Sequence, residues 1–342
     1  MKTNEFIGNW PAQNKDSWLR QIIEENAAKV LPPTNFRIED EIFANAFAFP
    51  TDVTNEGNVL KSNGTLDFWK SGLEIRISNL EEAKLKLDQA LTQGAEYIHF
   101  IFELEPDIKT TDYLLHQVYL DLIASRWSFD ATCDLNNFKN NLLDKYGNSC
   151  KIYQTGAAQN NIKNQVDLFS RFYVSNLNSW ADNLINLLEN LKICNKINEH
   201  IIFEIYLNHD FLLNICASRA LKLVIHKLWA TLNISILPII ELHIDRQSLT
   251  SDFHSNLYKI ASICLSASIA NGDYIVIPDA KMLQSSSELQ AIKSTLHIQH
   301  ILKQEAYMDR LLDASAGSYF MEDLTEKISK NIWSQLQNKL NT

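Results

Sequence analysis

The sequence lacks several features that mark common functional classes. It contains no G-x-G-x-x-G turn and no P-loop, so the usual phosphate-binding turns of dinucleotide and nucleoside triphosphate sites are not predicted. No apolar run approaches the length that spans a bilayer, and the first residues have no apolar core of signal-peptide length. We therefore expect a cytoplasmic protein without a membrane span.

Cysteine and excess positive charge are also scarce. The five cysteines form no C-x-x-C pair, and their number is odd, which argues against a disulfide framework and favours a reducing compartment. The net charge is -10. Because nucleic acids and anionic membranes are bound by basic surfaces, neither is expected as a partner. The 342 residues, 46% of them hydrophobic, are enough for one large core.

From residue 72 onward, short apolar segments alternate with amphipathic ones. The segments that read as strands are residues 73–77, 97–103, 127–132, 151–154, 201–207, 236–243, 274–278 and 319–321. Helices are predicted between these strands from the spacing of apolar residues, for example over residues 112–125 and over a long stretch at 159–191. Such a succession of strand–helix units predicts an α/β fold, a (β/α)8 barrel of the TIM type, with a doubly wound sheet as the alternative.

The first 70 residues differ from the rest. A short helix is predicted over residues 16–29, and Pro32-Pro33 ends it. The segment contains too few periodic elements for a domain of its own. We expect residues 1–70 to form an N-terminal arm that packs on the barrel or on a partner, and residues 71–342 to form the barrel.

Polar residues at strand ends are the candidates for chemistry, because a barrel carries its active site where strands lead into the following loops. These positions are Glu103, Gln154, Asn208, His209, His243, Asp245, Asp279 and Glu322. Each of these residues could instead have a purely structural role, capping a helix or making a hydrogen bond in a loop. His243 and Asp245 could pair as a base and its orienting carboxylate. His297 and His300 share a predicted helix, but no ligand of suitable spacing accompanies them, so no metal site is predicted.

The C-terminal stretch carries a distinctive sequence motif. Residues 311–336 read LLDASAGSYFMEDLTEKISKNIWSQL, and this segment resembles the last strand and helix of the barrel domain of methylmalonyl-CoA mutases. The residues that match the family's sequence motif are Asp313, Gly317, Ser318, Tyr319, Glu322, Leu324, Thr325 and Trp333. Residues 211–229, with Arg219-Ala220 and Leu228-Trp229, are similar to a helix of the same family.

Departures from the family pattern are as informative as the matches. Residues 153–158 resemble a segment in which catalytic subunits carry Tyr-His beside the substrate thioester, but here Gln154 follows Tyr153. Glutamine cannot act as a general acid. The family's Arg-x-Tyr-Ala-Gly-Phe motif after the first strand is absent, and so is the Asp-x-His-x-x-Gly motif of the cobalamin-binding domain. We therefore expect no cobalamin-binding domain, no catalytic residue and no cofactor or metal bound by this chain.

The resemblance implies a small, non-catalytic (beta) subunit of a heterodimeric methylmalonyl-CoA mutase, an isomerase. The large catalytic subunit would bind adenosylcobalamin and interconvert methylmalonyl-CoA and succinyl-CoA, while this chain would be structural and inactive alone. A homodimer in the absence of that partner, and entry of acyl-CoA, are left open. Bulky strand residues would fill the barrel axis: Ile98, Phe100, Ile202, Ile205, Ile239, Ile275 and Ile277.

The alternative is a stand-alone TIM-barrel enzyme with its site at the C-terminal strand ends. The candidate residues at the barrel mouth are Tyr153, Gln154, His209, His243 and Asp279.

Overall fold

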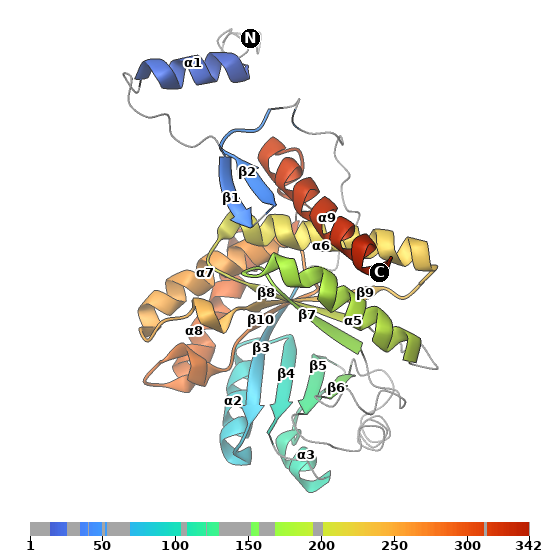
Figure 1. Cartoon of the computed structure of the whole chain (residues 1–342). Coiled ribbons are helices and arrows are strands. Elements are labelled where there is room, and N and C mark those ends of the chain that lie inside the picture. The colour runs from blue at the N-terminus through green and yellow to red at the C-terminus, as the bar shows by residue number, and fades with distance from the viewer. Residues whose placement is uncertain are drawn as a thin grey trace, which may run out of the picture.

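A parallel sheet of eight strands forms the centre of the molecule (Figure 1). In this computed structural model the strand order is β6-β5-β4-β3-β10-β9-β8-β7, and neighbouring strands in this order pair in parallel. The strands are β3 (Lys70–Ile77), β4 (Tyr97–Phe102), β5 (Ala124–Phe129), β6 (Ile152–Gly156), β7 (Leu168–Tyr173), β8 (Ile201–Leu207), β9 (Pro238–Ile244) and β10 (Tyr274–Ile277). The order follows the chain in a circle, with the last strand beside the first, which confirms the predicted (β/α)8 barrel class.

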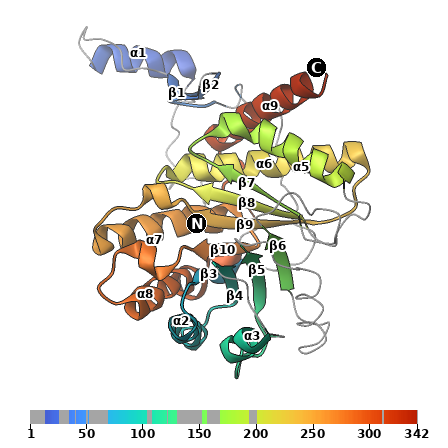
Figure 2. The same ribbon diagram turned by 60° about the horizontal axis from the view of Figure 1, so that its bottom comes forward.

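The structure describes residues 14–25, 35–39, 41–49, 52, 69–103, 108–120, 122–129, 152–156, 168–193, 201–310 and 313–341, with only the backbone for 108, 152–156 and 193. Helices surround the sheet, as Figure 2 shows from a second direction. They are α2 (Leu80–Thr92), α3 (Ile108–Leu114), α5 (Trp180–Ile193), α6 (Phe211–Leu232), α7 (Phe253–Ala270), α8 (Glu288–His300) and α9 (Tyr319–Leu340). None of the helices described is long and apolar enough to cross a membrane.

Short polar side chains fix where these helices begin and end. Asn79 caps α2 by accepting a hydrogen bond from the Glu82 N–H at 3.2 Å, and Asp210 caps α6 in the same way. Such caps satisfy backbone donors that have no partner within the helix. At the other end of α6, Asn233 takes the left-handed conformation (φ 54°), which terminates the helix.

The eighth strand lies elsewhere than predicted. Residues 319–321 are the first turn of α9, because the turn at Gly317 (φ 82°) leads to Ser318 at the N-cap position. The missing strand is β7, inside the stretch predicted as a helix over 159–191. Its sequence, LFSRFY, alternates buried and less buried residues with a period of two. The predicted helix over 112–125 is likewise shorter, since α3 ends at Leu114.

Most of the bulky strand residues expected in the barrel axis face the helices instead. Ile98, Phe100, Ile205, Ile275 and Ile277 belong to the large core between sheet and helices. Only Ile202 and Ile239 are found in a second, small apolar cluster, with Tyr97, Ala124, Phe169, Tyr274 and Val276. Alternate strand residues point to opposite faces, so the rest of the axis has to be filled by other side chains.

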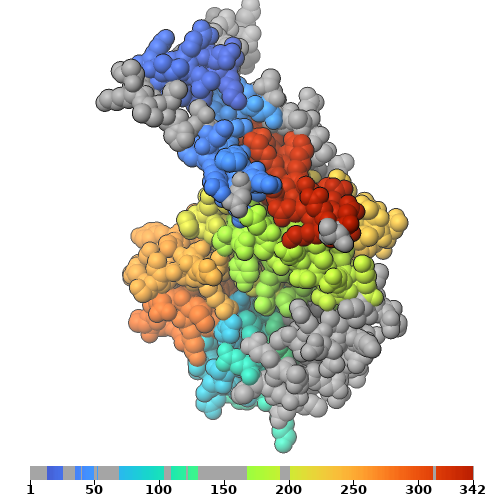
Figure 3. All heavy atoms as spheres, in the orientation of Figure 1, coloured from blue at the N-terminus to red at the C-terminus, as the bar shows by residue number. Residues whose placement is uncertain are grey.

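The described part of the N-terminal segment contains helix α1 (Lys15–Glu25) and a hairpin of β1 (Asn35–Glu39) and β2 (Ile42–Asn45). The hairpin packs on α9: the Lys327 ammonium donates to the Phe43 carbonyl at 3.1 Å, and the Asn45 amide donates to Asp323 at 3.1 Å. Helix α1 buries none of its residues and stands away from the barrel (Figures 1 and 3). The division of the chain at residue 70 stays a prediction.

Residues that carry the C-terminal sequence resemblance meet in one ion cluster. The Arg219 guanidinium lies 3.0 Å from Asp313 and 2.8 Å from Glu322. Glu322 also accepts a hydrogen bond from the Gly317 N–H at 3.2 Å. Glu322 therefore lies in the first turn of α9 rather than at a strand end, and it joins α6 to the turn before α9.

Candidate functional site

The interior of the barrel holds charged and polar side chains that the sequence analysis did not single out, apart from His243. We call them the barrel-centre cluster: Glu74, His99, Arg126, Arg171, Glu204, Tyr206, Glu241 and His243. Arg126, Glu204 and Glu241 have no exposed surface. Burying three charges together is favourable only where each finds a partner.

Arg126 supplies that pairing from the opposite side of the barrel. Its guanidinium lies 2.5 Å from a Glu204 oxygen on β8 and 2.7 Å from a Glu241 oxygen on β9, although Arg126 itself is on β5. The remaining oxygens are also satisfied: Tyr97 donates its hydroxyl to Glu241 at 2.5 Å, and Arg171 donates to Glu204 at 2.8 Å. The ion pairs therefore cross the barrel axis.

The pKa values follow from this pairing. Burial alone would raise the pKa of Glu241, but Arg126 and the hydrogen bond with His243 outweigh it and hold the pKa at about 2. The pKa of Glu204 is lowered still further, because Arg126 and Arg171 both oppose the effect of burial. Both carboxylates are therefore ionised at neutral pH, and the cluster is an ionic network rather than a set of neutral acids.

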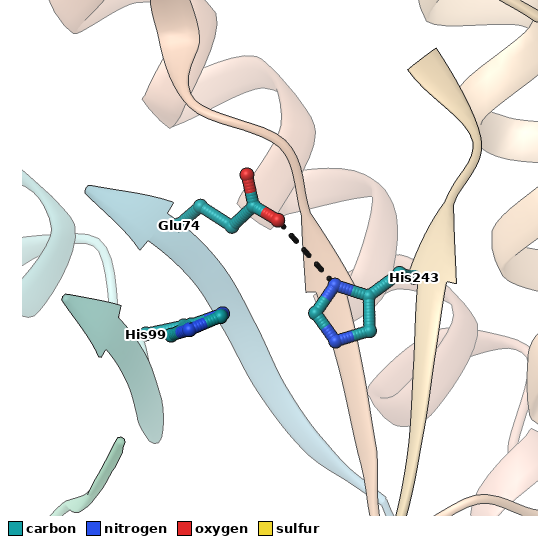
Figure 4. Close-up of side chains that lie close together, drawn as sticks. All are labelled: Glu74, His99 and His243. Atoms are coloured by element: carbon teal, nitrogen blue, oxygen red, sulfur yellow. Dashed lines mark ion pairs between the residues drawn. The ribbon is translucent and has the colours of Figure 1, made fainter. Parts of the chain in front are cut away.

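His243, Glu74 and His99 form the second half of the cluster (Figure 4). His243 places Nε2 2.9 Å from Glu241 and Nδ1 3.4 Å from Glu74. The other oxygen of Glu74 is paired with Arg246. His99 places Nε2 2.7 Å from the Ser128 hydroxyl.

The two histidines have opposite protonation behaviour. Burial lowers the pKa of His243, but the hydrogen bond to the Glu241 carboxylate and the ion pair with Glu74 reverse the effect and raise the pKa to about 9. For His99, burial and the neighbouring Arg126 act in the same direction and lower the pKa to about 3. A cationic imidazole therefore faces a neutral imidazole across the barrel, with ring centroids 5.9 Å apart.

The structure corrects the predicted partner of His243. Asp245 does not orient its ring; the Asp245 carboxylate instead accepts from the Gln247 N–H at 3.0 Å and caps a short 3-10 helix. The carboxylate beside His243 is Glu241, two residues earlier on the same strand. Residues two apart on a strand face the same way, and β9 continues through both.

The other candidate residues at the barrel mouth do not join the cluster. Asp279 is fully buried, accepts from the Arg76 N–H at 2.8 Å and lies 3.3 Å from the Lys86 ammonium. His209 is exposed in the loop after β8. Tyr153 lies on β6 beside Arg126 in the strand ladder, and Gln154 follows it. The side chains of these two residues lie outside the described part of the chain.

One sequence signal could have revealed the cluster. Strands β8 and β9 read IIFEIYL and PIIELHI, each with one glutamate in the middle of an apolar run. The two glutamates are paired in the ladder. A buried carboxylate at such a position requires a cation, so these strands indicate a buried arginine or histidine elsewhere in the barrel.

The ionic network should make the protein less stable both at acidic and at alkaline pH. The lowered pKa of Glu241, about 2 against 4.5, contributes stability above pH 4.5 that is lost as the pH falls toward 2. The raised pKa of His243, about 9 against 6.5, contributes stability below pH 6.5 that is lost as the pH rises through 9. Each pKa unit corresponds to about 1.4 kcal/mol, so losses of a few kcal/mol are expected on each side.

Urea unfolding at a series of pH values measures this dependence. We expect the free energy of unfolding to be highest between the two limbs, and Glu241→Gln to flatten the acid limb. A stability maximum above pH 9 would contradict the assignment of charges.

Comparisons with known proteins find similarity in the C-terminal half of the chain. The family model of methylmalonyl-CoA mutase matches residues 187–339. A methylmalonyl-CoA mutase small subunit from Porphyromonas gingivalis (strain ATCC BAA-308 / W83) is 33% identical over 82 residues, which cover 24% of this chain and 13% of that protein. The matched stretch therefore spans only a small part of the length of that curated relative.

Solved dihydropteroate synthases are also similar in structure. The Yersinia pestis enzyme has a TM-score of 0.36 at 12% identity, covering 72% of this chain and 98% of that chain. The Xanthomonas albilineans enzyme with 4-aminobenzoic acid has a TM-score of 0.41 at 10% identity, covering 71% and 94%. The sequence comparisons are the specific finding: over residues 187–339 the chain is similar to the methylmalonyl-CoA mutase family, as its C-terminal sequence predicted.

Proposed function

We propose that this chain is the non-catalytic small subunit of a heterodimeric methylmalonyl-CoA mutase. Its large partner subunit would bind adenosylcobalamin and interconvert methylmalonyl-CoA and succinyl-CoA, and this chain would stabilise that partner. The similarity to a protein described as a mutase small subunit supports the proposal, together with the departures from the catalytic pattern at Gln154 and after the first strand.

The crossing of the barrel axis by ion pairs is the observation that carries the proposal. The resemblance implies that a catalytic mutase leaves a channel in its barrel for the pantetheine chain of CoA. Here Arg126 reaches across to Glu204 and Glu241, and all three are fully buried. A substrate chain on this path would have to separate paired charges that are already removed from water, which costs several kcal/mol. The geometry thus favours a structural barrel.

Exposed apolar side chains on the N-terminal segment support a partner. Ile23, Phe36, Phe43 and Phe47 are between 45% and 52% exposed, and Figure 3 shows that the segment carrying them projects beyond the barrel. Apolar side chains gathered on a projecting element are typical of a protein–protein interface. We assign this surface, here called the arm surface, to contact with the large subunit.

Association is the first test of the proposal. The chain should form a one-to-one complex with the large mutase subunit from the same genome, measured by light scattering after size-exclusion chromatography. Alone, it should not bind methylmalonyl-CoA in a calorimetric titration. Failure to associate, together with acyl-CoA binding by the isolated chain, would instead favour a stand-alone barrel enzyme.

A further inference from the structure

Three side chains of the barrel-centre cluster converge on one point. Glu74 on β3, His99 on β4 and His243 on β9 each offer one ligand atom, and these atoms lie within 4.8 Å of one another. All three residues are at most 3% exposed. Figure 4 shows the Glu74 carboxylate and the two imidazole rings facing a common space between the strands.

On both imidazole rings the hydrogen bond is made by Nε2 and none is made by Nδ1. His99 uses Nε2 for the Ser128 hydroxyl, and His243 uses Nε2 for the Glu241 carboxylate. The Nδ1 atoms of both residues are buried and make no hydrogen bond, and that of His243 has only the 3.4 Å ion pair with Glu74. An unsatisfied buried polar atom costs about 1–3 kcal/mol, so the unpartnered Nδ1 of His99 close to this pair requires an explanation.

From this geometry we propose that Glu74, His99 and His243 bind a divalent transition-metal ion. Two imidazole nitrogens and one carboxylate oxygen suit Zn²⁺ or Fe²⁺, whereas Mg²⁺ and Ca²⁺ prefer all-oxygen sites. Two ligands at about 2.0–2.1 Å from a tetrahedral ion lie about 3.4 Å apart. The separation of His243 Nδ1 and Glu74 Oε1 is 3.4 Å. The ligand atom that His99 offers lies within 4.8 Å of both.

The surroundings match those of a metal centre. Metal-bound histidines donate their other ring N–H to a carboxylate or another oxygen, which fixes the ring and its tautomer. Glu241 holds this position for His243, and Ser128 holds it for His99. Arg246 pairs with the second Glu74 oxygen, and the first oxygen, which lies 3.4 Å from His243 Nδ1, is the one that would bind the ion. The ion and a proton compete for His243 Nδ1, so binding releases any proton there to solvent.

The site is independent of the proposed subunit role. Glu74 and His99 lie outside residues 187–339, which match the mutase family. Three protein ligands leave a coordination position open for water, as in metal sites that bind a small ligand.

Metal titration of the isolated full-length chain tests the proposal without any mutase assay. After removal of metals with a chelator, we expect one Zn²⁺ per chain at micromolar affinity or tighter. Glu74→Gln and His99→Gln should each weaken that affinity at least 100-fold. The matched control is His297→Gln with His300→Gln. These histidines lie on α8 and bond to Gln93, so Zn²⁺ affinity should be unchanged.

X-ray absorption at the zinc edge of the unsubstituted chain keeps the test valid if a variant fails to fold. The proposal predicts two imidazole ligands and further oxygen ligands. It is overturned by the absence of a stoichiometric site, by thiolate coordination, or by binding that survives both cluster substitutions and is lost in the His297/His300 control.

Discussion

Replacing Arg126 with methionine is expected to lower the free energy of unfolding by about 3–5 kcal/mol. Methionine keeps much of the side-chain volume but removes the positive charge. Among the ion pairs described, Arg126 is the one cation that contacts both Glu204, at 2.5 Å, and Glu241, at 2.7 Å. Both carboxylates are fully buried, so neither can recover its hydration. Urea unfolding followed by circular dichroism measures the loss.

The control removes the carboxylates together with the arginine. Arg126→Met combined with Glu204→Gln and Glu241→Gln should be less destabilised than Arg126→Met alone, because no unpaired charge is then left in the barrel. A loss below about 1 kcal/mol for the single variant would contradict an ionic network across the axis. So would a triple variant that is less stable than the single one.

Substituting the arm surface is expected to abolish tight association with the large subunit. Phe36→Ser with Phe43→Ser removes two aromatic side chains that are 52% and 45% exposed. Buried aromatic anchors contribute about 2 kcal/mol or more each to an interface, so affinity should fall at least 100-fold. The free energy of unfolding of the isolated chain should change by only about 1 kcal/mol, because these side chains are already half exposed.

A matched pair of substitutions on the barrel separates a specific interface from general loss of apolar surface. Leu232→Ser with Leu237→Ser removes side chains that are 46% and 60% exposed, at the end of α6 and beyond it. Affinity for the large subunit should stay within about threefold of the unsubstituted chain. Equal losses from both pairs would contradict the assignment of the arm surface. Surface plasmon resonance on the purified subunits measures both.

Local sequence patterns predicted the fold well where one pattern dominated. β8 spans Ile201–Leu207, the predicted range, because a short apolar run stands between polar residues. β7 (Leu168–Tyr173) was missed because it is short and only six residues separate it from α5, so the helix predicted over 159–191 included both. Tyr319 and Phe320 resemble strand residues in type, but α9 begins at Tyr319, directly after the turn at Gly317.

Reading along the chain indicates Glu204 and Glu241, each a lone glutamate in an apolar strand, but not the residues that pair with them across the barrel. Arg126 is 78 residues from Glu204 and 115 from Glu241, and only the ladder register and the closure of the sheet bring them together. Pairing of Glu204 with Glu241 is fixed by the register of β8 and β9. His243 was predicted as a strand-end residue, but its role follows from Glu241, two residues earlier on β9, and from Glu74, which lies far away in the sequence on β3.

Mutase turnover measured with separated subunits tests whether this chain is a non-catalytic subunit that supports a catalytic partner. The large subunit, this chain and their mixture are each assayed for conversion of methylmalonyl-CoA to succinyl-CoA with adenosylcobalamin present. The account predicts no turnover by this chain alone, and turnover by the mixture that exceeds or outlasts that of the large subunit alone. Turnover by this chain alone, or activity and stability of the large subunit that are unaffected by it, would contradict the account.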